Sequence, residues 1–305
     1  MIDNFIKFTF FGNIFVGILA VALSFETAVQ LGAPFNSTAY YLLLFFATMA
    51  YYTYAYVNVA VSNKQHNPRT LWYAKHRKFV RLNLVFSIGI SFLLIIYLTF
   101  RNIHHLLRLP LMYWGIIIIV VLAGILYYGL LPKSFLPLNI RKTGLLKAFV
   151  IGFVWASCVN LFPLIMLRIE HNVSFADPFL ISWLFTKTFM FCTVNAIMFD
   201  IKDYAEDANK QLKTFVVRFG LRNTIFQILI PLLLIGVFSM IVFANYRHFS
   251  VIPLLINILP FALSLLVAYS MHRRQNILYY LIVIDGLLLV KAICGITAMH
   301  FVNIV

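Results

Sequence analysis

The sequence predicts an all-α, polytopic membrane helical bundle. Of its 305 residues, 63% are apolar and 11% are charged, whereas soluble domains are roughly half apolar and a quarter charged. The chain also contains many separate apolar stretches near the roughly 20 residues that a helix needs to cross a bilayer. Open strands cannot satisfy their backbone groups in lipid, so each stretch is expected to be helical. The whole chain, residues 1–305, is expected to form one integral-membrane domain.

About nine apolar runs divide the chain into candidate transmembrane helices. The first run resembles the hydrophobic region of a signal peptide, but its length and the many runs that follow favour a retained helix. Four prolines lie inside the later runs and are expected to bend helices there, namely Pro163, Pro231, Pro253 and Pro260. The expected spans are Phe8–Gln30, Ala39–Val61, Leu82–Phe100, Leu111–Leu131, Ala148–Leu167, Phe179–Phe199, Thr224–Ala244, Val251–Met271 and Ile277–Val302.

Lysine and arginine residues are concentrated in alternate connections between these spans. The connections after the second, fourth and sixth spans are rich in them, whereas those after the third, fifth and seventh carry only one or two. By the positive-inside rule, we expect the N-terminus and the even-numbered connections in the cytoplasm and the C-terminus outside. The net charge of +15 then reflects this topology first, and secondly attraction for anionic headgroups or a phosphorylated substrate, so it requires no nucleic acid.

Four of the nine acidic residues fall within eight positions, just after the sixth apolar run. Asp200, Asp203 and Asp207 are spaced i, i+3 and i+7, which stacks three carboxylates on one face of a continuing helix. They would repel one another, and they lie near a helix C-terminal end, where the macrodipole disfavours anions. A Mg²⁺ ion that bridges to substrate phosphates would compensate for this charge. The alternative is a solvated acidic cap that pairs with nearby lysines, namely Lys202, Lys210 and Lys213.

The segment from Asp200 to Gly220 resembles a known motif. Asp200-Ile-Lys-Asp203-Tyr-Ala-Glu-Asp207, followed by Leu-Lys213-Thr and by Arg-Phe-Gly220, is similar to the second aspartate motif of the UbiA superfamily of intramembrane prenyltransferases. That family carries the motif at the end of the sixth of nine helices, as this chain does. The resemblance implies a UbiA-like bundle that transfers a polyprenyl group from its diphosphate to a lipid-soluble acceptor, such as an aromatic quinone precursor. It also implies that the three aspartates hold Mg²⁺ and that Lys213 helps to bind the substrate.

The corresponding first motif is altered in this chain. The family places an Asn followed by two aspartates at the end of helix two, in outline N-x-x-x-D-x-x-x-D. Here the segment YAYVNVAVSNKQHNPRT keeps the frame as Asn58, Ser62 and His66, with Arg69 behind it, but carries no carboxylate. A hydroxyl is a weak neutral ligand and imidazole suits softer metals than Mg²⁺, so one of the two metal sites is expected to be weak or absent. The resemblance still implies substrate-binding roles for these four residues.

A third segment follows the fourth span. Tyr127, Tyr128 and Lys133 resemble the family's Tyr-to-Lys segment, whose lysine faces the diphosphate. The resemblance therefore implies that Lys133 binds substrate. The same residues are also typical of the aromatic belt and flanking lysine at the end of any transmembrane helix.

Among the charged residues inside expected spans, Lys187 lies in the sixth, and Asp285 and Lys291 lie in the ninth. Burying such a charge is costly unless it is paired or hydrated. An ion pair between Asp285 and one of the lysines is one explanation, and a transport pathway is another. The sequence therefore leaves three functions: a divergent Mg²⁺-dependent prenyltransferase, a catalytically silent homologue that binds an isoprenoid or another lipid, and a membrane transporter.

Overall fold

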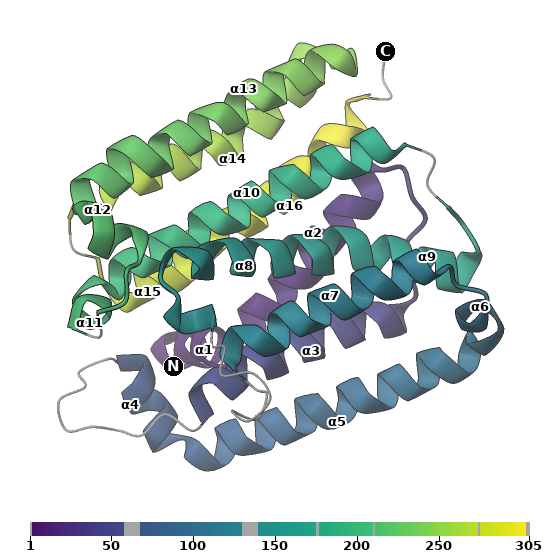
Figure 1. Cartoon of the computed structure of the whole chain (residues 1–305), viewed down its shortest axis with the longest axis horizontal. Coiled ribbons are helices and arrows are strands. Elements are labelled where there is room, and N and C mark those ends of the chain that lie inside the picture. Colours follow the sequence, from purple (N-terminus) through teal and green to yellow (C-terminus); the bar gives the residue numbers. More distant parts are fainter. Residues whose placement is uncertain are drawn as a thin grey trace.

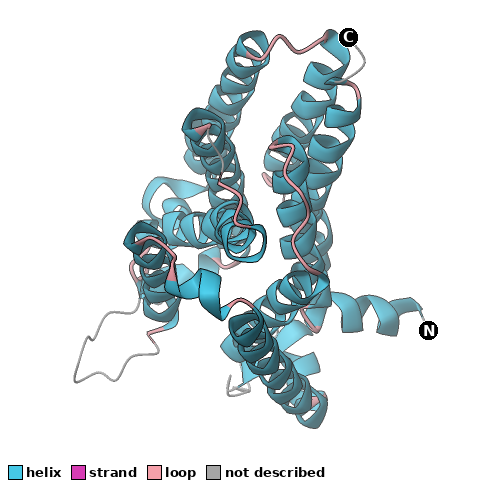
Figure 2. Ribbon diagram, turned by 90° about the vertical axis from the view of Figure 1, so that its right-hand side faces the viewer, coloured by secondary structure: helices cyan, strands magenta, loops and turns pink. Residues whose placement is uncertain are grey.

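The regular structure of the protein is helical throughout the part that can be described. The computed structural model describes residues 2–57, 68–129, 140–174, 177–209, 211–273 and 275–302, without the side chains of 2–4, 142 and 206. No strand occurs among these residues. Figure 1 shows long helices that lie roughly side by side, and Figure 2 shows the same bundle turned by 90°. The expected all-α bundle is confirmed.

The described chain is built as a multi-pass membrane protein. Seven of its helices are long and apolar enough to cross a bilayer, and the bent pair α1 (Ile2–Phe11) and α2 (Ile14–Gln30) makes an eighth. The second expected span, α3 (Thr38–Val57), is 20 residues long, but its six tyrosines make it less apolar. It packs against both α2 and α5 (Arg77–Arg101). The other spans are α7 (Leu111–Tyr128), Leu145–His171, α10 (Pro178–Lys202), Phe215–Tyr246, α14 (Val251–Ser270) and Ile277–His300.

Three of these spans are interrupted by a π-helical turn. Pro163 and Pro231 each come just after such a turn. A proline has no N–H to donate to the preceding turn, so that turn can widen without losing a further hydrogen bond. The interrupted spans are α8 (Leu145–Ala156), η2 (Ser157–Leu161) and α9 (Phe162–His171); α12 (Phe215–Asn223), η3 (Thr224–Leu229) and α13 (Ile230–Tyr246); and α15 (Ile277–Tyr279), η4 (Tyr280–Ile284) and α16 (Asp285–His300).

The first expected span is bent near its start. The axes of α1 and α2 differ by 61°, and Asn13 at their junction has a φ of 62°. Asn is one of the few residues that tolerates this left-handed conformation. Its buried amide donates to Thr53 Oγ1 and to Tyr73 OH, each at 3.0 Å, and accepts a bond from Arg69 at 2.5 Å. These contacts to α3 and α4 (Pro68–Lys75) fix a bend that the apolar pattern does not reveal.

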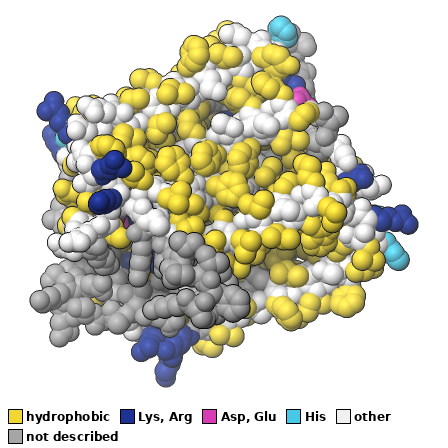
Figure 3. All heavy atoms as spheres, viewed as in Figure 1, with side chains coloured by type: hydrophobic (Ala, Val, Ile, Leu, Met, Phe, Trp, Pro, Cys, Tyr) yellow, Lys and Arg dark blue, Asp and Glu magenta, His cyan; other side chains and the backbone are white. Residues whose placement is uncertain are grey.

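The bundle has two distinct ends. Figure 1 places α1, α4, α11 (Tyr204–Asn209) and α15 at one end, here called the α11 end. The opposite end, here called the α6 end, holds α6 (Ile103–Leu107) and the last turn of α16. Figure 3 shows apolar side chains over the middle of the visible face, with Lys and Arg toward the edges. Among the seven spans other than α1 and α2, α10 is the most buried, whereas α5 and α7 are the least buried.

The close packing of α8 against α10 depends on Gly152. A Cβ atom at this position would lie 2.9 Å from the backbone oxygen of Phe189 and would also collide with the hydroxyl of Thr193. By contrast, a Cβ atom at Gly89 in the outer helix α5 would meet nothing within 4 Å. The two glycines are therefore a matched pair, one at a helix crossing and one in open space.

Gly152→Ala is expected to lower the free energy of unfolding by about 1–3 kcal/mol, because α8 and α10 must move apart. Gly89→Ala is expected to leave stability unchanged or to raise it by up to about 1 kcal/mol, because alanine favours the helix. Thermal unfolding of both purified variants in detergent measures the difference. Equal midpoints for the two variants would contradict the close crossing.

Candidate functional site

Two of the three motif aspartates converge on one lysine at the α11 end. Lys147 Nζ, in the first turn of α8, lies 2.6 Å from Asp200 Oδ1 and 4.0 Å from Asp207 Oδ2. Asp200 is 1% exposed and Asp207 is 6% exposed. Two carboxylates therefore face one ammonium group where water has little access. In the sequence, Lys147 is one cation of the basic connection after the fourth expected span. Its partners cannot be read from the sequence, because they depend on the packing of α8 against α10.

Asp203 does not join this pair, because the helix does not continue straight through the motif. α10 ends at Lys202, and Asp203 caps it with φ −93° and ψ 6° before α11 begins. The Asp203 carboxylate instead lies 3.0 Å from Lys202 Nζ and is 33% exposed. The i, i+3, i+7 spacing predicted three carboxylates on one face, and the structure has a buried pair and a separate surface ion pair. A surface pair of this kind contributes little to stability.

The aspartate pair could supply some, but not all, of the oxygen ligands that a hard divalent cation needs. Mg²⁺ commonly takes one or two carboxylates from a protein and its other ligands from water and substrate phosphates. Asp200 Oδ2 is buried and has no hydrogen-bond partner among the described residues, so it is an acceptor without a donor. Within the same residues, no three His, Cys, Asp or Glu side chains are grouped to hold a metal. The pair would therefore hold Mg²⁺ together with substrate oxygens, after Lys147 has moved aside.

Arg69 is buried at the same end of the bundle. Its guanidinium lies 4.1 Å from the ring centroid of Tyr56 and donates to Asn13 Oδ1. The hydroxyl of Tyr73 donates to a backbone carbonyl of α1 at 2.6 Å. Burial raises the pKa of the Tyr73 phenol, so the hydroxyl keeps its proton at neutral pH. Arg69 also lies within electrostatic range of Asp285 on α16, so it faces the interior of the bundle.

Tyrosines of α3 and α7 pack against one another in a group that is here called the tyrosine wall. The ring centroids of Tyr51 and Tyr128 are 4.7 Å apart, and those of Tyr127 and Tyr128 are 5.0 Å apart. The guanidinium of Arg141, in the short helix η1 (Ile140–Lys142), lies 5.8 Å from the centroid of Tyr128. Tyr127 is within electrostatic range of both Arg141 and Asp200. Aromatic faces next to cations suit a ligand with an anionic head and an apolar body.

The structure describes two of the six residues that are expected to bind substrate, Arg69 and Lys213. Asn58, Ser62, His66 and Lys133 lie outside the described residues. Lys213 is exposed in the connection between α11 and α12, and its backbone, rather than its side chain, packs against Gly144. Of the two expected substrate-binding residues that are described, Arg69 is buried at the α11 end and Lys213 is exposed.

A second group of charges lies within the bundle. Lys291 Nζ is 2.6 Å from Glu26 Oε2, and Lys187 Nζ is 3.6 Å from Glu26 Oε1. The expected pairing of these lysines with Asp285 is therefore wrong: both use Glu26, because α16 packs against α2. Sequence reasoning missed Glu26, although a lone carboxylate inside an apolar run is costly to bury and is a signal for a partner elsewhere.

Comparison of the chain with family models, with curated proteins and with solved structures finds no match. The class that the fold defines is a helical, multi-pass membrane protein. A fold of this kind does not by itself imply an activity. Function therefore has to be argued from the aspartate pair and its surroundings.

Lys147→Met is expected to lower the free energy of unfolding by about 3–5 kcal/mol, because it leaves the buried Asp200 carboxylate without the cation that lies 2.6 Å away. Lys202→Met is the matched control and is expected to cost at most about 1 kcal/mol, because its partner Asp203 is partly solvated. The double variant Lys147→Met/Asp200→Asn is expected to recover much of the loss. Unfolding in detergent measures all three, and similar costs for the two lysine variants would contradict the buried pair.

Proposed function

We propose that the protein is a divergent UbiA-type prenyltransferase. It would transfer a polyprenyl group from its diphosphate to a lipid-soluble acceptor, such as an aromatic quinone precursor. The observation that carries this proposal is the pair of buried carboxylates, Asp200 and Asp207, directed at one cation position at the end of a membrane bundle. Proteins use such a pair to hold Mg²⁺ against substrate phosphates. Buried carboxylates in a membrane helix are otherwise costly, which favours a functional role.

The two ends of a prenyl diphosphate match the two environments at this site. Arg69 and Arg141 offer guanidinium groups, which bind phosphate oxygens in a bidentate manner. Arg69 is held in place by Asn13 and Tyr56, so it would meet the diphosphate with little reorganisation. The tyrosine wall of α3 and α7 and the apolar spans behind it would surround the prenyl chain.

The proposed reaction breaks the bond between the allylic carbon and the diphosphate oxygen, and the diphosphate leaves with the electron pair. A nucleophilic carbon of the acceptor forms the new bond to the allylic carbon and then loses a proton. Mg²⁺ held by Asp200 and Asp207 would supply positive charge to the leaving diphosphate. Lys147, Arg69 and Arg141 would add the protein's own positive charge there. The tyrosine rings would keep water from the allylic cation and stabilise it through their faces.

We also propose that the α11 end faces the cytoplasm. The basic connections after the second, fourth and sixth expected spans favour this orientation. In addition, α1 and the last turn of α16 lie at opposite ends of the bundle, which agrees with an odd number of crossings when α3 is counted (Figure 1). The N-terminus would then lie inside and the C-terminus outside.

A second candidate function is lipid binding by a catalytically silent homologue. Lys147 supports it, because an ammonium group already lies between the two carboxylates. Such a protein would bind an isoprenoid without Mg²⁺ and without turnover. A transporter has less support, because Lys187 and Lys291 are both paired with Glu26.

Turnover can be tested with the purified protein in nanodiscs, labelled allylic diphosphates, Mg²⁺ and a membrane lipid extract. A prenylated product is expected, and Asp200→Asn is expected to lower its rate at least about 100-fold, because the leaving group loses its electrostatic support. Asp203→Asn is the matched control and is expected to change the rate less than about tenfold, because it removes only a surface pair.

The outcomes separate the candidate functions. Binding of the labelled diphosphate without product and without dependence on Mg²⁺ would favour the silent homologue. An equal loss of rate in the two Asn variants would contradict the role of the buried pair. Solute uptake into vesicles that depends on Lys187 or Asp285 would favour the transporter.

The cation position can also be tested without turnover. In Lys147→Met, Mn²⁺ is expected to raise the thermal midpoint, because it replaces the lost ammonium group; at about 100 times its Kd the gain would be about 2.7 kcal/mol. The unmodified protein is expected to gain less, since Lys147 competes for the same carboxylates. Adding Asp207→Asn to the variant should remove the effect. No stabilisation of Lys147→Met by Mn²⁺ would contradict a cation site at this pair.

A further inference from the structure

The charges of Glu26, Lys187 and Lys291, here called the Glu26 cluster, do not balance. Lys187 and Lys291 carry two positive charges and Glu26 carries one negative charge, which leaves a formal +1. None of the three residues is more than 7% exposed. An uncompensated charge inside a membrane bundle is expensive. The cluster therefore requires either a counter-anion or the loss of a proton.

The excess charge lies on the Lys187 side of this cluster. Lys291 Nζ is close to Glu26 and donates a further bond to Thr188 Oγ1 at 3.2 Å. Lys187 Nζ is farther from Glu26, at 3.6 Å, and its one hydrogen bond among the described residues is to Asn257 Oδ1 at 3.2 Å. An ammonium group has three donors, so Lys187 is the less satisfied of the two lysines.

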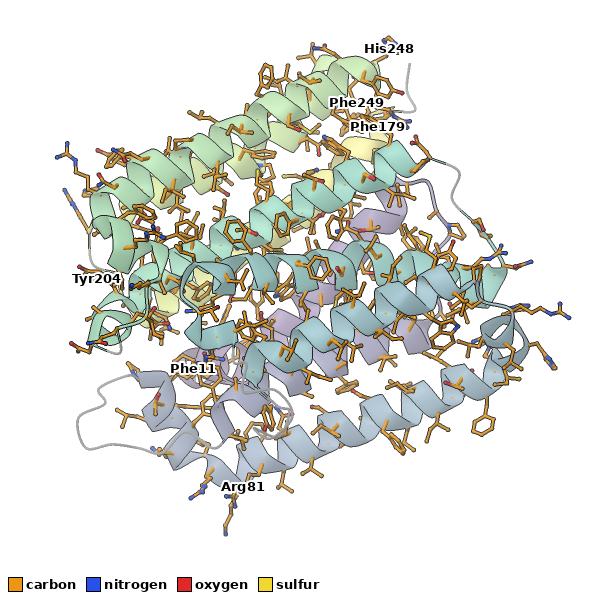
Figure 4. The ribbon with its side chains drawn as sticks, in the orientation of Figure 1. Phe11, Arg81, Phe179, Tyr204, His248 and Phe249 are labelled. Carbon is orange, nitrogen blue, oxygen red and sulfur yellow. The ribbon has the colours of Figure 1, made fainter. Side chains whose placement is uncertain are left out.

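A small recess lies next to Lys187, toward the α6 end where Figure 4 labels Phe249. Its lining includes Gln30 and Asn257, whose amides are bonded to Glu26 and to Lys187. It has room for about one water-sized particle. The recess is therefore separated from the charged cluster by a single layer of side chains.

The remaining polar lining of the recess favours an anion. The ring centroid of Trp183 lies 5.3 Å from Lys187 Nζ, and the indole is held flat against Phe243 with centroids 3.6 Å apart. Arg247 also lines the recess, and its nearest described carboxylate, Asp177, is 3.9 Å away and 48% exposed. None of the lining residues is acidic. One cation, Arg247, therefore lines the recess, and a second, Lys187, lies behind Asn257 and Trp183, with no carboxylate in the wall.

We propose that this recess binds a small monovalent anion, such as chloride, against Arg247 and one layer of side chains away from Lys187. The anion would balance the extra positive charge of the Glu26 cluster. A monatomic anion fits because it is closest in size to a water molecule. This site is distinct from the aspartate pair: Lys187 and Asp200 are 200 − 187 = 13 residues apart on α10, which is about 20 Å at the rise of an α-helix.

Chloride dependence of stability is the first test. Thermal unfolding of the purified protein would be followed while chloride replaces gluconate at constant ionic strength. A saturable rise of about 2–4 °C is expected, because a ligand bound only by the folded state raises its stability. Arg247→Gln is expected to weaken the chloride response about tenfold, as is typical when one ionic contact is lost. Arg168→Gln is the matched control, because this arginine caps the exposed end of α9 and lies outside the recess.

Bromide quenching of Trp183 is the second test. Trp72, Trp114 and Trp155 would be replaced by Phe, so that Trp183 is the only indole left. Quenching that saturates with bromide and is weakened by Arg247→Gln would support the site. Lys187→Met should abolish it, and if that variant does not fold, Arg247→Gln still decides the question. The proposal would be overturned if quenching rose linearly and equally in Arg247→Gln and Arg168→Gln, or if the thermal midpoint did not depend on chloride. The excess positive charge would then be removed by a neutral lysine instead.

Discussion

The central constraint on this bundle is that charged side chains within it need partners from neighbouring helices. α10 carries Asp200 and Lys187 at two different levels, and it is the most buried of the seven spans other than α1 and α2. At the α11 end, Asp200 of α10 pairs with Lys147 of α8, and farther along α10, Lys187 approaches Glu26 of α2. Removing one partner of such a buried pair costs far more than removing a surface pair. The positions of α2, α8 and α16 around α10 follow from these requirements as much as from apolar packing.

The two charge groups, Asp200 and Asp207 with Lys147, and Glu26 with Lys187 and Lys291, cannot compensate each other. The Glu26 cluster has one formal positive charge in excess, and Asp200 Oδ2 is a buried acceptor that has no hydrogen-bond donor among the described residues. About 20 Å separates them along α10, so their attraction is of order 1 kcal/mol at an effective dielectric constant near 20. That energy is too small to offset the burial of either charge. The excess charge of the Glu26 cluster therefore has to be balanced locally, toward the α6 end, and the cation proposed at the α11 end is a separate matter.

Apolar runs predicted the seven spans that are long and apolar enough to cross a bilayer, because membrane helices must satisfy their backbone internally. The bend at Asn13 was not predictable, since it depends on Thr53 and Tyr73, which come from other helices. The aspartate spacing predicted three carboxylates on one face, but α10 ends at Lys202 and turns Asp203 away, so Asp200 and Asp207 approach Lys147 without it. Partners such as Lys147 and Glu26 are distant in sequence, so only the packing of the helices identifies them.

Under the proposed function, Lys147 would also decide which cation the aspartates accept. Its ammonium group is tethered to α8, so it occupies the carboxylates without the entropy loss that a free ion pays on binding. A divalent ion alone must displace it while gaining only two carboxylates and few other ligands. A divalent ion bound to diphosphate brings its own oxygen ligands, and the displaced lysine gains a new anionic partner. The site would therefore prefer the metal–diphosphate complex to either component alone, and an internal cation would couple metal binding to the presence of substrate.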